Sequence, residues 1–389
     1  MMSLVNKKIG IVGAGIMGRL LAWQLVNQGH KVTLFDKDPI ESGDAAAYTA
    51  AGMLTPYSEI ESAELLIYQM GKESLKLWPE IIESFDCDVG FHQKGSLIVS
   101  HINDKPDLIR FDQQLNFKLG SKLLDNVDER TGKIGQAELA ELEPELTVNF
   151  SSATYLAEEA WLCTHRVMRT LAGLLLEKEV RWIADTKIDD LGANFVIEKS
   201  AVSAKATQHE FDWVIDSRGL GAKKDLSDLR GVRGELLLVQ APDVKINRLV
   251  RLMHPRYKLY VVPKYNDDLY LIGATQIESD DDGPITVRST LELLSAAYSL
   301  HSGFAEARVL ESKTNCRPAL FDNLPRIETQ LEKQGGLIRV NGLYRHGFLL
   351  APSLAQQVCG LINKTSENEI VYPGLIKSFE KAKIKQAVL

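Results

Sequence analysis

The sequence contains few of the residues that form disulfide bonds or bind structural metal ions. Its four cysteines are far apart and form no C-x-x-C pair: Cys87, Cys163, Cys316 and Cys359. Its eight histidines form neither an H-x-x-x-H nor an H-E-x-x-H motif. Cysteines in this arrangement indicate reduced thiols rather than a disulfide framework, and the histidine spacing predicts no metal site.

Long apolar runs and an excess of basic residues are also absent. The apolar segment Ile9–Met17 is interrupted by glycines and followed by Arg19, and no segment reaches the roughly 18 uncharged apolar residues that span a membrane. The 45 basic and 52 acidic residues give a net charge of −7, which argues against nucleic-acid binding. We therefore expect a soluble, cytoplasmic protein with neither membrane nor nucleic-acid partners.

The composition that remains is that of an ordinary globular protein. Hydrophobic residues make up 45% and charged residues 25% of the 389 positions, without an internal repeat. A chain of this length buries enough apolar surface to fold without disulfides or metals. At about 150 residues per domain, it predicts two or three domains.

The first 36 residues have the pattern of a β-α-β unit. Residues 8–13 predict a buried strand, residues 16–29 a helix and residues 31–36 a second strand. Further helices are expected at 62–84, over most of 105–145, and at 164–178, 288–302 and 353–363. Further strands are expected at 91–100, 180–183, 194–198, 211–216, 231–240 and 337–341, with a hairpin formed by 259–264 and 269–275. Both ends of the chain have nucleotide-fold patterns, so we expect a mixed α/β protein with interleaved domains.

A glycine-rich turn, G-A-G-I-M-G at 13–18, joins the first strand to the first helix. Gly13 permits the tight turn, Gly15 lets the backbone approach a pyrophosphate, and Gly18 lets the helix pack closely on the sheet. The helix N-terminus attracts phosphates. Asp36 ends the second strand 18 residues after Gly18, where a carboxylate binds a ribose hydroxyl. This context predicts a dinucleotide site, and the acid at position 36 disfavours NADP.

Two features favour FAD over NAD. The small residues at 43–53 follow the second strand and would let a long, flat cofactor lie against the backbone. A glycine-bearing turn at 344–352 precedes the last helix, whose N-terminus suits the electron-rich end of a flavin ring. An NAD-linked dehydrogenase, with an ordinary strand–helix connection at 344–352, remains the alternative.

Seven motifs, in this order along the chain, resemble those of the D-amino-acid-oxidase (DAO) family of FAD enzymes, and most of all its glycine oxidases of the ThiO type. They are G-A-G-I-M-G at 13–18, A-A-G-M-L at 50–54, V-R-G-E-L at 232–236, H-P-R-Y-K-L-Y-V-V-P at 254–263, I-G-A-T at 272–275, R-P-A-L-F-D-N-L-P at 317–325 and Y-R-H-G-F-L-L-A-P at 344–352. The resemblance runs almost from end to end of the chain.

The resemblance implies a fold and its domain boundaries. A Rossmann-like FAD-binding domain of the glutathione-reductase type would be interleaved with a sheet-rich substrate domain. The FAD-binding domain would comprise 1–87, 151–230 and 317–389, and the substrate-binding domain 88–150 and 231–316.

The resemblance also implies contacts with non-covalently bound FAD. Ile16 and Met17 would lie beside the pyrophosphate, while Asp36 and Lys37 would hold the adenosine ribose. The backbone of Lys187 would contact adenine. The residues expected along the rest of the cofactor are Ala46, Ala47, Ala51, Gly52, Met53, Gly219, Arg345, His346, Gly347, Phe348 and Leu349.

For the substrate, the resemblance implies that Arg317 and Arg345 bind a carboxylate and that Tyr260 orients it. A guanidinium suits this role because it offers a planar, bidentate clamp. We expect Arg317 in a loop before Pro318 and Arg345 in the loop before the last helix. The alternatives are surface charges for the arginines and a core aromatic for Tyr260. No catalytic residue is assigned with certainty, because an amine that binds neutral can lose hydride directly; His254 and His346 are the nearest candidate bases.

The resemblance finally implies an activity: oxidative deamination of glycine or a similar small amino acid. Oxygen would be reduced to hydrogen peroxide, and the product could serve thiamine biosynthesis through a thiazole synthase partner; a homo-oligomer is left open. Gln276, Lys258 and Arg218 depart from the residues common in the family, which leaves the substrate open. The alternatives are an oxidase or dehydrogenase of another amine, of the sarcosine, proline or D-amino-acid type, and a flavoprotein that modifies or matures a partner protein.

Overall fold

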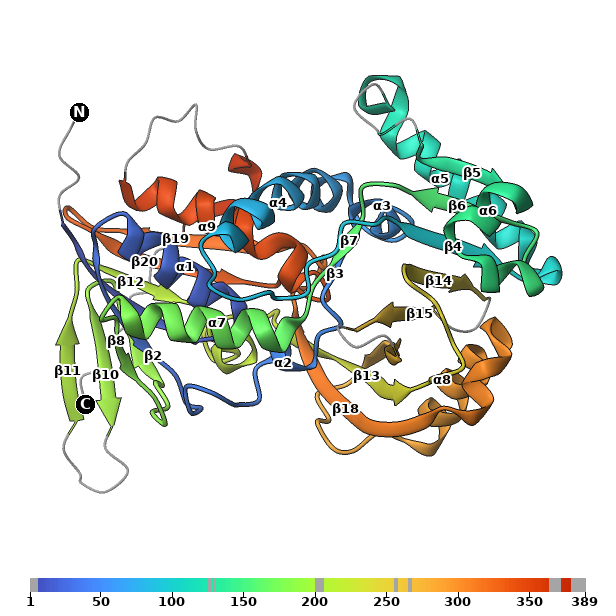
Figure 1. The fold of residues 1–389 in the computed structure, drawn as a ribbon. Helices are drawn as coiled ribbons and strands as arrows, with labels where there is room; N and C mark the ends of the chain where they lie inside the picture. Colours follow the sequence, from blue (N-terminus) through green and yellow to red (C-terminus); the bar gives the residue numbers. More distant parts are fainter. Residues whose placement is uncertain are drawn as a thin grey trace.

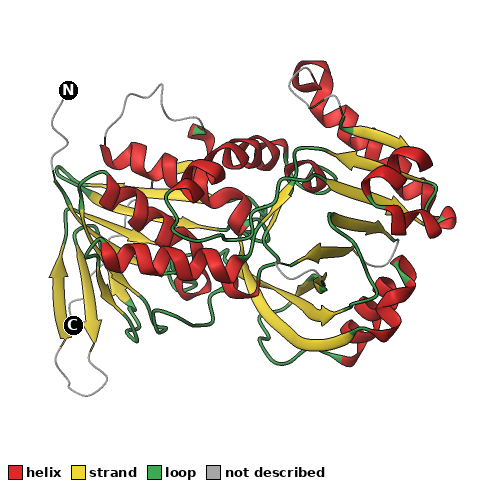
Figure 2. Ribbon diagram, viewed as in Figure 1, coloured by secondary structure: helices red, strands yellow, loops and turns green. Residues whose placement is uncertain are grey.

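The computed structural model describes residues 6–124, 128, 130–199, 206–254, 258–264, 268–363 and 372–378. Two large sheets lie side by side in Figure 1, with most of the helices packed around the first. Figure 2 shows the same mixture of helices and strands by colour, and it confirms the predicted mixed α/β class. In the described part of the chain, no helix is long and apolar enough to cross a membrane.

The first sheet is built around the predicted β-α-β unit. In spatial order its seven strands are β21 (Ile376–Ser378), β19 (Arg326–Leu331), β20 (Gly336–Asn341), β12 (Trp213–Asp216), β1 (Lys8–Val12), β2 (Lys31–Phe35) and β8 (Arg181–Ile183). β1 pairs in parallel with both β2 and β12. Segments from the two ends of the chain therefore form one sheet.

Four helices cover this sheet: α1 (Ile16–Asn27), α4 (Leu65–Glu83), α7 (Thr164–Glu177) and α9 (Gly347–Asn363). Figure 1 shows α1 beside α7 and α9, and α4 beside α9. Their buried apolar side chains form one core with the sheet, as an amphipathic helix face requires. A small sheet of β9 (Asp190–Leu191), β10 (Phe195–Lys199) and β11 (Ala206–Glu210) adjoins it.

The second sheet has nine strands and its own core. In spatial order they are β17 (Ile277–Glu278), β13 (Arg230–Gln240), β16 (Leu269–Gly273), β15 (Lys258–Pro263), β14 (Leu249–Met253), β4 (Ser96–Ser100), β6 (Ser152–Leu156) and β5 (Gly132–Gly135), while β18 (Arg308–Ala319) pairs with β13. The helices α5 (Lys105–Leu124), α6 (Gln136–Leu142) and α8 (Val287–Leu300) accompany it. β15 and β16 confirm the predicted hairpin.

Short elements connect the two sheets. They are α2 (Ala46–Thr49), β3 (Met53–Leu54), α3 (Pro56–Glu59) and β7 (Ala160–Trp161), and β3 pairs with β7. The predicted stretch of small residues at 43–53 thus becomes a connector that runs between the sheets.

Two sequence predictions, the loop position of Arg317 and the start of the last helix, were wrong. Arg317 lies on β18 and not in a loop. β18 is an edge strand with long exposed stretches, so it lacks the alternating pattern that marks a strand, and an edge tolerates Pro318. The region 105–145 is mainly helical, as predicted, and it also includes the short strand β5. The last helix begins at Gly347 and not at 353.

Candidate active site

A cavity of about 760 Å³ extends from the glycine-rich turn after β1 to the strands of the second sheet. This volume lies within the range of roughly 300–1,000 Å³ typical of ligand pockets. Its lining includes every residue predicted to bind the cofactor or the substrate except Gly18, namely Gly13, Gly15, Ile16, Met17, Asp36, Lys37, Ala46, Ala47, Ala51, Gly52, Met53, Lys187, Gly219, Tyr260, Arg317, Arg345, His346, Gly347, Phe348 and Leu349. The cavity therefore brings together residues from both ends and the middle of the chain.

The glycines of the first turn have the distinct roles that their spacing predicts. Gly13 has a φ of +104°, and a Cβ there would lie 2.6 Å from the carbonyl oxygen of Ser217. A Cβ at Gly18 would lie 1.8 Å from the carbonyl oxygen of Gly13, so Gly18 packs the helix closely behind the turn. At Gly15, a Cβ would meet only Ala45, at 4.0 Å. The backbone at Gly15 is thus open to a ligand.

The N-terminus of α1 faces the same cavity. Gly15 is its N-cap, and no side chain caps the helix, which leaves N–H groups of the first turn, at Ile16 and Met17, for a phosphate. Asp36 follows β2 and accepts hydrogen bonds from the backbone N–H groups of Ala14 and Asp38. Burial raises the pKa of Asp36. These hydrogen bonds fix its carboxyl group beside the turn.

The wall beyond the turn is made largely of backbone and small side chains. Gly52 has a φ of +82°, and a Cβ there would lie 2.1 Å from the carbonyl oxygen of Leu162. Gly219 opens a 3₁₀ turn, η3 (Gly219–Ala222), and its carbonyl accepts a hydrogen bond from Asn341 at 2.9 Å. The side chain of Lys187 turns toward Asp189, with the two charged groups 3.5 Å apart. This wall is suited to an extended, flat ligand.

Arg218, one of the departures from the family pattern, is occupied by two ion pairs. Its Nη2 lies 2.8 Å from Asp216 and 2.7 Å from Asp225. Burial lowers the pKa of Arg218, but the hydrogen bond and charge of Asp216 outweigh it, so the net shift is upward. The side chain of Lys258, a second departure, lies outside the described residues.

Trp78 explains why α9 begins earlier than the sequence predicts. Pro352, inside this helix, has no N–H to donate to the carbonyl of Phe348, four residues earlier. The indole Nε1–H of Trp78 donates to that carbonyl instead, at 2.9 Å. The substitute donor comes from α4, far away in the sequence. It allows the helix to extend to Gly347, whose backbone lines the cavity.

Arg317 enters the cavity from β18 with its charge uncompensated. Its Nη1 donates to two backbone carbonyls, those of Thr275 at 3.1 Å and Arg233 at 3.4 Å. Among the described residues, no carboxylate forms an ion pair with it. A Cβ at Gly234 would lie 2.1 Å from its Nη2, so the guanidinium lies directly against the backbone at Gly234.

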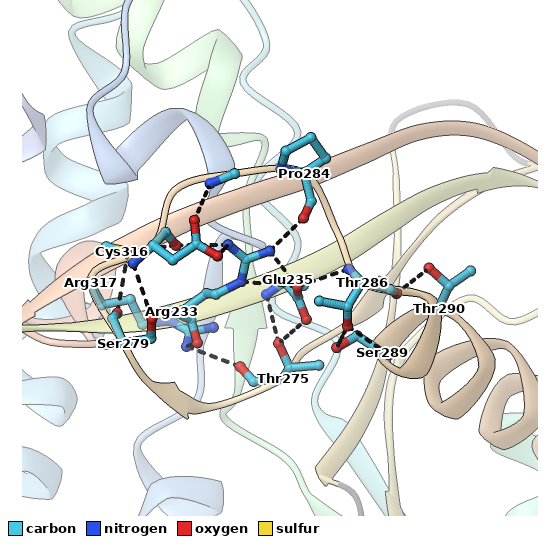
Figure 3. Close-up of polar contacts among 12 residues, drawn as sticks. Arg233, Glu235, Thr275, Ser279, Pro284, Thr286, Ser289, Thr290, Cys316 and Arg317 are labelled. Carbon is cyan, nitrogen blue, oxygen red and sulfur yellow. Dashed lines mark hydrogen bonds and ion pairs between the residues drawn. The ribbon is translucent and has the colours of Figure 1, made fainter.

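A buried polar network supports this arginine (Figure 3). Nε and Nη2 of Arg233 donate to Glu235 Oε1 at 3.0 and 2.7 Å. Thr275 donates its hydroxyl to Glu235 Oε2 at 3.1 Å and its N–H to the Glu235 carbonyl at 3.2 Å. Burial raises the pKa of Glu235, but hydrogen bonds from Ser289 and Arg233 outweigh it and lower the pKa. The network fixes the Thr275 carbonyl that holds Arg317.

Arg345 lines the cavity too, but it already has a carboxylate partner. Its Nη2 pairs with Glu59, the last residue of α3, and donates to Ser62 at 2.6 Å. Its Nη1 lies 3.4 Å from Gln276 Oε1. Direct binding of substrate by Arg345 stays a prediction. Sequence reasoning missed Glu59, because no spacing signals a pair of residues 286 positions apart.

The groups beside this pair have shifted pKa values. Burial alone would raise the pKa of Glu59, but the charges of Arg345, His346 and Arg251 lower it to about 2. Burial lowers the pKa of His346 to about 4, so its ring is neutral at pH 7. Burial also raises the pKa of Tyr260, which is half-buried on β15 and packs against Gly273. Of the two candidate bases, His346 lines the cavity and His254 does not.

A family model and related sequences place this chain among FAD-dependent oxidoreductases, and a solved structure shares its fold. Residues 8–361 match the DAO family of FAD dependent oxidoreductases. A Rhizobium etli protein that carries the name thiamine biosynthesis oxidoreductase ThiO is 38% identical over 351 residues, which cover 90% of this chain and 95% of that protein. A glycine oxidase from Geobacillus kaustophilus is 26% identical over 375 residues, covering 92% of this chain and 93% of that enzyme. The crystal structure of glycine oxidase from the same species matches with a TM-score of 0.78 at 23% identity, covering 97% of this chain and 100% of that chain.

The residues that line the cavity fit FAD. The open backbone at Gly15 and the uncapped N-terminus of α1 suit a pyrophosphate. The wall around Gly52 would let a flat ring lie against the backbone. The family match identifies the cofactor as FAD rather than NAD. The chain belongs to the DAO family of FAD-dependent oxidoreductases, and FAD is its cofactor.

Proposed function

We propose that the chain oxidises glycine, or a similarly small amino acid, to the corresponding oxo acid and ammonia. The observation that carries this proposal is Arg317, a guanidinium without a carboxylate partner among the described residues, in the cavity that contains the dinucleotide turn. A half-buried cation without a carboxylate partner favours an anionic ligand. The carboxylate of a small amino acid supplies that charge.

Each part of the chain then has a stated task in the reaction. Arg317 holds the substrate carboxylate, and Tyr260 limits how the substrate can turn above the wall around Gly52. When bound, FAD accepts the hydride that leaves the substrate Cα. The resulting imine takes up water and releases ammonia and, from glycine, glyoxylate. Oxygen takes the two electrons and two protons and leaves as hydrogen peroxide.

The proposal requires no general base. An amine that binds in its neutral form loses hydride without further deprotonation. His346 is neutral at pH 7 because burial lowers its pKa to about 4, and its Nδ1 lies 3.7 Å from Glu59 Oε2. We assign His346, with Phe348 and Leu349, to the wall around the flavin ring.

We also propose how the chain holds its cofactor without a covalent bond. Ile16 and Met17 would contact the pyrophosphate, and Asp36 with Lys37 the adenosine ribose. The backbone of Lys187 would contact adenine. Ala46, Ala47, Ala51, Gly52 and Met53 would lie along the flavin. The structure supports these assignments by placing all of these residues on the cavity wall.

The similarity to a protein named for thiamine biosynthesis supports a role in that process. We propose that the imine or glyoxylate is passed to a thiazole synthase, and that the protein acts in the cytoplasm. A pull-down with the thiazole synthase of the same organism, with and without glycine, tests this part separately.

A second candidate substrate is another small amine, such as sarcosine, proline or a D-amino acid. The specific observation in its favour is the extent of the cavity, which continues past Tyr260 to Arg288, Glu292 and Leu293 on α8. That space would accept a substituent on the nitrogen or on Cα.

One experiment separates these possibilities. The FAD-loaded protein is mixed anaerobically with glycine, sarcosine, proline or D-alanine while the flavin absorbance is recorded, and peroxide is measured after air is admitted. Bleaching by glycine at the fastest rate supports the proposal, and faster bleaching by another amine favours the second candidate. If none of these amines bleaches the flavin, amino acid oxidation is overturned, and action on a partner protein becomes the better hypothesis.

A further inference from the structure

The substrate end of the cavity contains more arginines than a small amino acid needs. Arg317, Arg345 and Arg251 all line it. Arg345 pairs with Glu59, and Arg251 pairs with Glu61. Arg317 contacts only backbone carbonyls among the described residues. Of these three cations, Arg317 is the one without a carboxylate partner among the described residues. Arg288 and Glu292 on α8 also line the cavity, and their opposite charges offset each other.

Glu59 is placed to control that balance. It lines the cavity as the last residue of α3, and its Oε2 contacts Nη2 of Arg345. Its side chain is 17% exposed and that of Arg345 is 20% exposed, so water screens the pair only in part. Ser62 shares the same guanidinium at 2.6 Å, which holds Arg345 toward α3.

The two other ionisable groups beside the pair, His346 and Arg251, do not neutralise the charge of Arg345. His346 Nδ1 lies 3.7 Å from Glu59 Oε2, but its ring is neutral at pH 7 because burial lowers its pKa to about 4. Arg251 is held by Glu61 and by the carbonyl of Ser58 at 2.9 Å. Glu59 is therefore the acid that cancels the charge of Arg345.

We propose that Glu59 sets the charge class of the substrate. By neutralising Arg345, it leaves a single positive site at Arg317, so the cavity accepts one carboxylate and disfavours a second carboxylate on the same ligand. This inference rests on the proposed function, in which the substrate is an amine that carries a carboxylate. It predicts small monocarboxylic amino acids as substrates and excludes acidic amino acids and N-carboxymethyl amines.

The test measures ligand binding and does not depend on oxidation. Acetate, malonate and the monomethyl ester of malonate are titrated into the FAD-loaded protein, and the flavin spectrum reports binding. Malonate and its ester have similar size but carry two and one negative charges. We expect the protein to bind the ester at least about tenfold more tightly than malonate, because the second carboxylate of malonate would face the negative charge of Glu59.

The variant Glu59→Gln should reverse this preference. The substitution frees Arg345. The variant should therefore bind malonate at least about tenfold more tightly than the unchanged protein does, while its affinity for acetate should change less than about threefold. Arg345→Gln, which keeps Glu59, should weaken malonate binding more than acetate binding, and it remains informative if Glu59→Gln does not fold. An unchanged ratio of malonate to ester binding in whichever variant folds would overturn the proposal.

Glu278→Gln is the matched control. It removes the same charge from a side chain that is 62% exposed and pairs with Arg230 at 3.6 Å, outside the cavity lining. The malonate-to-ester ratio should not change in this variant; an equal change would show that only the overall charge matters and would overturn a specific role for Glu59. If the ligands bind as expected but no amine bleaches the flavin, the proposed amino acid oxidation fails, while the role of Glu59 in selecting the charge of the ligand is upheld.

Discussion

The two ends of the cavity are built in different ways. The cofactor end is lined largely by backbone and small residues, and Gly13 and Gly15 belong to one short turn. The substrate end is lined by long charged side chains from α3, β18 and the connection before α9, including a pair 286 residues apart. We therefore propose that one end binds through shape and backbone contacts, and the other through charge. Changes at the two ends should therefore have separable effects.

The largest effect is expected from Arg317→Ala. Removing this guanidinium, which has no carboxylate partner among the described residues, should cost about 2–5 kcal/mol of substrate binding. That corresponds to an increase in KM for glycine of roughly 30-fold or more, while the FAD content per chain stays unchanged. Steady-state kinetics and the flavin absorbance of the purified protein measure both. Arg317→Lys is the control, and a KM within a few-fold of the original in Arg317→Ala would contradict the role.

The second prediction concerns Glu159, a buried carboxyl beneath α3. It accepts hydrogen bonds from the N–H and hydroxyl of Ser58 at 2.7 and 2.8 Å. Burial raises its pKa from 4.5 to about 7. Because the folded-state pKa is the higher one, its stabilisation is complete below pH 4.5 and is lost as the pH rises through about 7.

The loss should reach about 3 kcal/mol, since each pKa unit corresponds to about 1.4 kcal/mol. In Glu159→Gln this contribution to the pH dependence should disappear. Urea denaturation at pH 5 and pH 8 measures the free energy of unfolding of both proteins. Parallel pH dependences for the two would refute the assignment.

Trp78 supports the helix α9 at the cofactor end of the cavity. Trp78→Phe removes the donor to the Phe348 carbonyl, which Pro352 leaves without a helical partner. We expect a loss of about 1–3 kcal/mol in the free energy of unfolding, with weaker FAD retention because α9 lines the cavity. Trp182→Phe is the control, because the indole N–H of Trp182 has no partner among the described residues. Equal losses in the two variants would remove the special role of Trp78.

The smallest effect is expected from Gly15→Ala. Its Cβ would meet no protein atom closer than 4.0 Å, so the fold should tolerate it. The methyl group would instead occupy the space predicted for the pyrophosphate and weaken FAD binding by roughly tenfold, or about 1.4 kcal/mol. FAD titration of the stripped protein measures this. Gly15→Ala should therefore have the opposite pattern to Arg317→Ala: FAD binding weakens, while KM for glycine stays unchanged in the protein that has bound FAD.

The same contrast explains what the sequence could predict. The dinucleotide turn was predictable because its constraints are local, such as the φ of +104° at Gly13 and the close packing at Gly18. Arg317 was identified only through the resemblance, and its strand was missed because the edge strand β18 shows no alternation. The pair of Glu59 and Arg345 and the support of α9 by Trp78 depend on tertiary contacts that no short pattern encodes.

The central claim is that one cavity holds the flavin at one end and a single carboxylate at Arg317 at the other. A crystal structure of the FAD-loaded protein with acetate tests it most directly. We predict a pyrophosphate at the turn that contains Gly15, and acetate on the Arg317 guanidinium above the flavin ring. Acetate bound elsewhere, or an Arg317 side chain turned away from the flavin, would contradict it.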